Sequence, residues 1–84
     1  MTAAGKSFGE QLRKERESQG LTAEAVAKAC GISRSHVTLI ENGQRLPGKK
    51  NISNIADALG IKAGVVLNWY LENITQKMRK DLTL

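Results

Sequence analysis

Two consecutive lysines, Lys49 and Lys50, carry the clearest candidate chemistry in the sequence, which is the binding of a phosphate group. They fall in the first turn of a helix that the apolar spacing predicts from about Lys49 to Leu59. Each cation at this positive end of the helix dipole is destabilising by roughly a few tenths of a kcal/mol. A phosphate docked there would reverse the sign of that effect. We therefore predict a phosphate contact; the alternative is that both lysines are simply solvated.

Residues for catalysis or metal binding are scarce. The chain has one cysteine and one histidine, Cys30 and His36, so it contains no nucleophile–base pair and no set of metal ligands. We expect no enzyme activity, no cofactor and no small-molecule ligand. Cys30 is expected to be a small buried core residue.

The overall charge favours a polyanionic partner. A formal net charge of +5 and a pI of about 9.7 point to nucleic acid, although many basic domains bind none. The 84 residues suffice for one domain, and a hydrophobic share of 40% is ordinary for a globular protein. The sequence has no apolar run long enough to cross a bilayer and no secretory signal, so we expect no membrane association and a cytoplasmic location.

Short helices joined by tight turns must position these residues, because glycines separate blocks of helical spacing. Thr22 and Ser33 are predicted N-caps, and Gly31 and Gly60 are predicted stops. The helices are predicted from Ser7 to Gln19, from Ala23 to Cys30, from Ser33 to Asn42, from Lys49 to Leu59, and from near Ala63 almost to the chain end. The predicted fold class is all-α with five helices, the fifth a candidate for an extended helix.

The link Gly31-Ile32-Ser33 is too short for an antiparallel pair of long helices. It suits two helices that cross at a steep angle, as in a helix-turn-helix. The second helix of such a pair projects polar side chains that can enter a major groove.

Residues 8–67 resemble the phage repressor and Cro-like helix-turn-helix family, also called XRE. The matching stretches are Phe8 to Leu12, LTAEAVAKACGISRSHVTLIENGQRLP from Leu21 to Pro47, and ISNIADALGIKAGVVL from Ile52 to Leu67. The resemblance implies a compact lambda-repressor-like domain and a transcriptional regulator that binds double-stranded DNA sequence-specifically.

By this resemblance the recognition helix runs from Ser33 to Asn42. Its expected DNA-facing residues are Ser33, Arg34, Ser35, His36, Thr38 and Leu39. Arg34 is the best candidate for reading guanine, because a guanidinium can bond to O6 and N7 together. The alternative to a DNA contact for His36 is that it is a solvated helix residue. The expected contacts to the DNA backbone are Asn42, Gln44, Arg45, Lys49 and Lys50.

Arg16 and Glu41 match a family pair that pins the first helix to the end of the third, and we expect a structural ion pair here. The alternative for Glu41 is a solvated helix residue. The sequence departs from the family at Ala23, where many members have Gln against DNA, and at Leu39, which is often polar or basic. Base specificity therefore does not carry over from any relative.

The C-terminal part of the fifth helix is the predicted site of dimerisation. An apolar stripe at helical spacing follows Leu67, Leu71, Ile74, Met78 and Leu82. The predicted dimer contacts are Leu67, Trp69, Tyr70, Leu71, Ile74 and Met78. The alternative is that this helix folds back and caps its own core. The predicted organisation is a flexible N-terminus (1–6), a helix-turn-helix domain (7–72) and a C-terminal extension (73–84) that is helical and part of the interface.

The leading functional hypothesis is a repressor or autoregulator that binds a two-fold DNA operator as a homodimer, because one such domain supplies few base contacts. Phage and mobile-element regulators, restriction–modification controllers and antitoxins of this family all fit the size, and an activator role stays open. The alternative from another class is a protein-interaction adaptor that uses the same fold without reading DNA.

Overall fold

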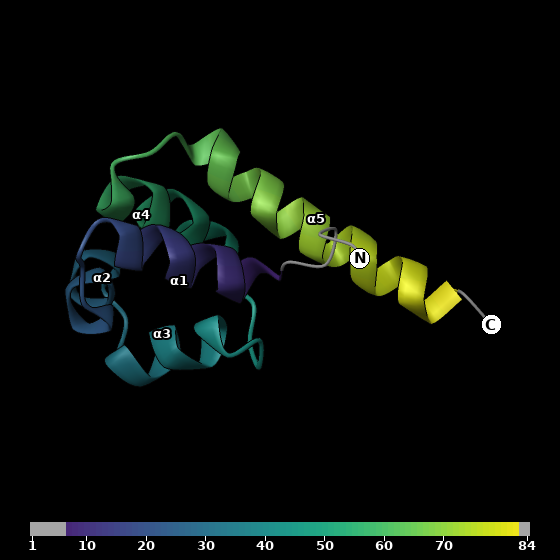
Figure 1. The fold of residues 1–84 in the computed structure, drawn as a ribbon, viewed down its shortest axis with the longest axis horizontal. Helices are drawn as coiled ribbons and strands as arrows, with labels where there is room; N and C mark the ends of the chain where they lie inside the picture. Colours follow the sequence, from purple (N-terminus) through teal and green to yellow (C-terminus); the bar gives the residue numbers. More distant parts are fainter. Residues whose placement is uncertain (1–6, 83–84) are drawn as a thin grey trace.

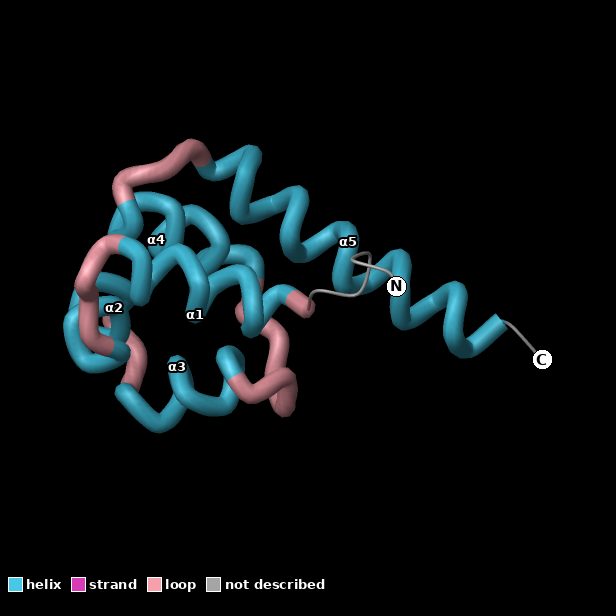
Figure 2. The backbone as a smooth tube through the Cα atoms, viewed as in Figure 1, coloured by secondary structure: helices cyan, strands magenta, loops and turns pink. Residues whose placement is uncertain are grey.

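The computed structural model describes residues 7–82 and contains five α-helices and no strand within that range (Figure 1). The helices are α1 (Phe8–Ser18), α2 (Ala23–Cys30), α3 (Arg34–Glu41), α4 (Lys49–Leu59) and α5 (Ala63–Leu82). Short loops join them, and the link between α2 and α3, residues 31–33, is the turn of the helix-turn-helix (Figure 2). The predicted all-α, five-helix fold is confirmed. The predicted N-terminal segment 1–6 lies outside the described residues.

Side-chain caps explain where three of these helices begin. The Ser7 hydroxyl accepts from the Glu10 backbone N–H at 3.2 Å, and the Glu10 carboxylate accepts from the Ser7 N–H at 3.0 Å, which completes a capping box. Thr22 and Ser33 cap α2 and α3 in the same way, at 3.0 and 3.1 Å. Helix α4 differs, because it begins after Gly48 with no side-chain cap and no acidic residue in its first turn.

The core receives residues from all five helices. Its buried apolar members are Phe8, Leu12, Val26, Ala27, Cys30, Val37, Ile40, Ile55, Ala56, Leu59, Val66 and Trp69. Phe8 is fully buried and meets the rings of Trp69 and Tyr70 edge-to-face, with ring centroids 6.0 and 6.4 Å apart. Cys30 is buried as expected, and its burial raises the pKa of the thiol.

Helix α5 has a packed first half and a second half that projects from the body of the molecule (Figure 1). The longest dimension is 41 Å against 21 and 20 Å in the other two directions. The Phe8 backbone N–H donates to Asn73 Oδ1 at 2.8 Å, which ties the start of α1 to the middle of α5. Helix α5 runs without a break through the predicted domain boundary between residues 72 and 73, so residues 73–82 continue the helix.

Candidate nucleic-acid interface

The turn between α2 and α3 has the geometry that a helix-turn-helix needs. Gly31 adopts a left-handed conformation with φ of 71°, which a residue with a β-carbon rarely adopts. The Ile32 N–H donates to the Ala27 carbonyl at 3.0 Å, which closes the end of α2. Ile32 packs against the core and Ser33 then caps α3. The direction of α3 is therefore set within a few residues.

Helix α3 has a buried face and an exposed polar face. Val37 and Ile40 are each 1% exposed and anchor α3 to the core. Four predicted DNA-facing residues, Arg34, Ser35, Thr38 and Leu39, line one shallow hollow of about 370 Å³. Of the remaining two, Ser33 is exposed at the cap and His36 is half-buried.

The side chains of this face differ in what they can offer a ligand. The Thr38 hydroxyl donates to the Arg34 carbonyl at 3.1 Å, so it keeps its acceptor capacity for a partner. Arg34 is exposed and forms no ion pair within residues 7–82, which leaves its guanidinium available for a base edge or a phosphate.

Glu41 anchors the C-terminal end of α3 to α1. Its carboxylate is 3% exposed, and Arg16 reaches it through Nε to Oε2 at 2.7 Å and Nη2 to Oε1 at 3.1 Å. Arg16 also donates through Nη1 to the Leu21 carbonyl at 2.7 Å. The hydrogen bond with Glu41 raises the pKa of Arg16. The expected pair is thus a buried clamp that holds α3, α1 and the α1–α2 turn together.

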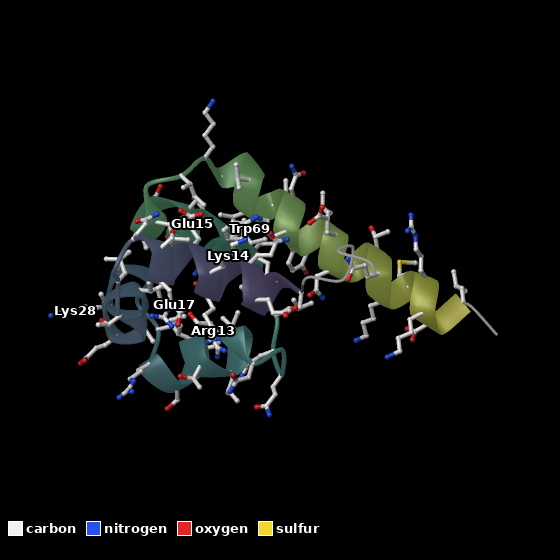
Figure 3. The ribbon with its side chains drawn as sticks, viewed as in Figure 1. Arg13, Lys14, Glu15, Glu17, Lys28 and Trp69 are labelled. Atoms are coloured by element: carbon white, nitrogen blue, oxygen red, sulfur yellow. The ribbon has the colours of Figure 1, made fainter. Side chains whose placement is uncertain are left out.

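Arg13 is a second arm of this clamp, and it was not predicted from the sequence. Its Nε lies 3.4 Å from Glu41 Oε1, and its Nη2 donates to Asn42 Oδ1 at 3.0 Å. Figure 3 shows Arg13 reaching from α1 toward α3. The signal was the spacing of Arg13 and Arg16, because residues three apart lie on one helix face. Asn42, predicted as a backbone contact, therefore has its side-chain oxygen engaged within the protein.

Gly9 lets α1 approach the end of α3 closely. A β-carbon at this position would lie 2.6 Å from the Glu41 carbonyl oxygen and closer still to that of Ile40. The backbones of the two helices therefore touch where the clamp acts. The residues around Gly9 in the sequence do not indicate this role.

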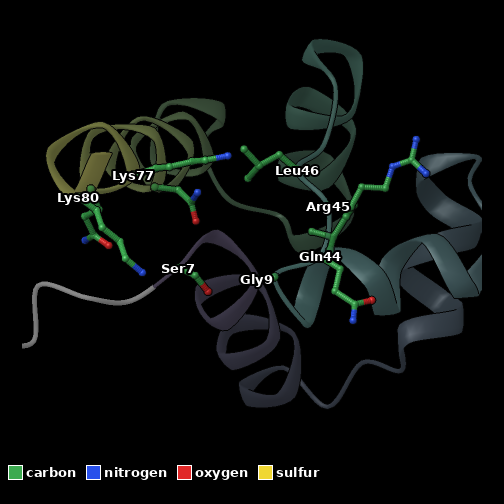
Figure 4. Close-up of a pocket in the computed structure, with 11 residues that line it drawn as sticks. Ser7, Gly9, Gln44, Arg45, Leu46, Lys77 and Lys80 are labelled. Atoms are coloured by element: carbon green, nitrogen blue, oxygen red, sulfur yellow. The ribbon is translucent and has the colours of Figure 1, made fainter. Parts of the chain in front are cut away.

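The predicted backbone contacts beyond α3 are all exposed. Gln44 and Arg45 extend in different directions from the loop (Figure 4). Lys49 and Lys50 occupy the first turn of α4, as predicted, and neither forms an ion pair within residues 7–82. Their contact with phosphate stays a prediction.

The residues predicted at a dimer interface divide into two groups. Leu67, Leu71 and Met78 are 43%, 49% and 57% exposed, and Ile74 is half-buried. The prediction is wrong for Trp69, which is only 9% exposed and belongs to the core of its own chain. Tyr70 is half-buried and packs against that core. The reason is that one face of α5 does cap the core, as the alternative proposed, while the stripe lies on another face.

Comparison with protein families identifies the family to which this chain belongs. The family model HTH_3, described as Helix-turn-helix, matches residues 12–66, which is more than half of the chain. The chain belongs to this helix-turn-helix family. It is a DNA-binding transcriptional regulator of the XRE type, as the resemblance implied.

Individual members of the family are similar over most of this chain. The ImmF control region 10 kDa protein of Bacillus phage phi105 is 36% identical over 62 residues, covering 74% of this chain and 69% of the relative. The HTH-type transcriptional repressor RghR of Bacillus subtilis is 45% identical over 56 residues, covering 66% of this chain but 42% of the repressor. The restriction–modification controller protein C.AhdI of Aeromonas hydrophila is 39% identical with a TM-score of 0.67, covering 70% of this chain and 89% of the solved one.

The family and these neighbours are DNA-binding regulators and not enzymes. Within residues 7–82, none of the helices combines the length and apolar character needed to span a bilayer.

Proposed function

We propose that this regulator is a repressor or autoregulator that binds a two-fold operator as a homodimer, with α3 in the major groove. The observation that carries the proposal is the exposed polar face of α3, held rigidly by the Glu41 clamp. A reading helix fixed at both ends loses little conformational freedom when it binds, which favours specific recognition. The names of a phage control protein and a transcriptional repressor among its relatives support the repressor role.

The exposed stripe on α5 supports the homodimer. Helical spacing of about 100° per residue places Leu67, Leu71, Ile74 and Met78 on one side of α5. Val66 and Trp69, which pack on the core, lie more than a quarter turn from the centre of this stripe. From Leu67 to Leu82 the stripe is about 22 Å long. A second copy related by a two-fold axis would cover it with the same stripe.

The test of DNA reading is selection of binding sites from random double-stranded DNA, followed by titration of the enriched site. We expect a site with two-fold symmetry and binding by two protomers. Loss of symmetry in the enriched site would contradict the homodimer, and the absence of any enriched site would favour the adaptor hypothesis.

The test of the stripe is sedimentation of two matched variants. Leu71→Glu places a charge on the stripe, whereas Val65→Glu places one at a residue of similar exposure, 42% against 49%, on another side of α5. We expect Leu71→Glu to sediment as a monomer at micromolar concentration and Val65→Glu to match the wild type. Equal masses for the wild type and both folded variants would contradict this interface. Truncation at Asn68 is unsuitable, because it would remove Trp69 from the core.

A further inference from the structure

A groove of about 490 Å³ lies between the start of α1, the loop after α3 and the second half of α5 (Figure 4). Ser7 and Gly9 line it from α1, and Gln44 and Leu46 line it from the loop. Its α5 wall includes Lys77 and Lys80, and no acidic side chain lines the groove among the described residues. Arg45 also lines the groove, although its guanidinium points away from α5 in Figure 4.

The two lysines occupy the core-facing side of α5, beyond the point where the core ends. Val66, Trp69, Asn73, Lys77 and Lys80 follow one another at steps of three or four residues, so they share one helix face. The first two pack on the core, and Asn73 accepts from the Phe8 N–H at 2.8 Å. The same face then carries Lys77 and Lys80, which extend over the groove toward Leu46 and Ser7 (Figure 4).

Favourable interaction with the helix dipole does not account for both lysines. Lys80 lies in the last turn of α5, where a cation is favoured, but Lys77 lies before that turn. Neither lysine forms an ion pair within residues 7–82, and both side chains are exposed. Two lysines without an ion-pair partner in the described part of the chain therefore line one groove that is open to solvent.

We propose that Lys77 and Lys80 bind the phosphodiester backbone of the DNA that α3 reads, so that the second half of α5 extends the DNA interface. The proposal rests on the proposed function, because the groove adjoins Gln44 in the loop that follows α3. A lysine ammonium is a compact charge with three donors and suits phosphate oxygens without reading sequence. One helix thus carries an apolar stripe on one side and a phosphate-binding face on another.

The test compares two double variants with the same change in net charge. Lys77→Gln with Lys80→Gln removes the groove cations. Lys28→Gln with Lys62→Gln removes lysines from the end of α2 and from the α4–α5 link, which lies on the opposite side of the molecule from α3 (Figures 1 and 3). Binding of the selected operator and of unrelated duplex DNA is measured over a range of salt concentrations.

We expect the groove variant to reduce the slope of log affinity against log salt by about one to two units per protomer, equally for both DNAs. The preferred site and the sedimentation mass should not change, and the control variant should keep a slope close to that of the wild type. Equal slopes for the two variants would overturn the proposal. So would a groove variant that loses self-association without a change in slope, because a second copy of the chain would then occupy the groove. If the proposed function is wrong, the wild type itself will select no DNA site. This result is distinguishable from failure of the groove proposal, in which the wild type still selects a site.

Discussion

Replacement of Arg16 by Met should unfold the domain more readily, because it leaves the buried Glu41 carboxylate without its main partner. Arg16 supplies two hydrogen bonds to a carboxylate that is 3% exposed, at 2.7 and 3.1 Å, and a third to the Leu21 carbonyl. Removing one partner of a buried ion pair costs about 3–5 kcal/mol. Arg13 remains 3.4 Å from the carboxylate and offsets part of this loss. We therefore expect a loss of about 3 kcal/mol in the free energy of unfolding.

The assay is urea denaturation followed by circular dichroism, with the slope of free energy against urea required to stay constant. Arg13→Met is the matched control, because the Arg13 side chain is 47% exposed and its contact with Glu41 is longer, at 3.4 Å. Exposed pairs contribute roughly 1 kcal/mol or less, so the control should lose no more than that. A double variant, Arg16→Met with Glu41→Leu, should recover part of the stability, since no charge is then left buried.

Two results would refute this reasoning. One is a loss below about 1 kcal/mol for Arg16→Met, which would mean that Glu41 is readily rehydrated. The other is an equal loss for the two single variants. Titration of Arg16 should not change the stability lost in Arg16→Met across acidic and neutral pH. Because Glu41 raises the pKa of Arg16, the contribution of this arginine is complete below its ordinary pKa and is lost only in strongly alkaline solution.

Three further predictions concern the DNA interface and the fold. Arg34→Ala should lower operator affinity by about 1–3 kcal/mol and relax base preference in site selection; an unchanged site would mean that this residue does not read bases. Lys49→Ala with Lys50→Ala should reduce the salt slope by about one to two units without loss of stability in thermal melts, whereas solvated lysines would leave the slope unchanged. Gly9→Ala should destabilise by about 1–3 kcal/mol in urea melts. Gly64→Ala, with nothing within 4 Å of the new β-carbon, should not destabilise, and equal effects would contradict the close contact of α1 and α3.

Local chemistry made the helix boundaries predictable. Thr22 and Ser33 are small hydroxyl residues before apolar blocks, and Gly31 and Gly60 follow the last residues of α2 and α4. Each of these signals acts within one helical turn, so the sequence around it contains the relevant partners. The Arg16–Glu41 pair is different, because its members are far apart in sequence and only the family resemblance brought them together.

Tertiary packing explains what could not be predicted. Periodicity gives the angle between Trp69 and Leu71 around α5, but it does not say which of them meets the core. That choice depends on Phe8, whose ring lies 6.0 Å from Trp69 and whose N–H bonds Asn73. Gly9 was missed for the same reason, since the absence of a side chain matters only where another backbone comes close.

The packing of α1 therefore connects the two halves of the proposed interface. Phe8 fixes which face of α5 turns inward, and that choice places Lys77 over the groove and Leu71 on the outside. Gly9 and Arg16, on the same helix, fix the end of α3. A change in the contact between α1 and α3 would therefore alter the position of α3 relative to both the dimer stripe and the lysine groove. Since a two-fold operator requires a fixed separation between two reading helices, we expect such a change to weaken operator binding more than binding to unrelated DNA.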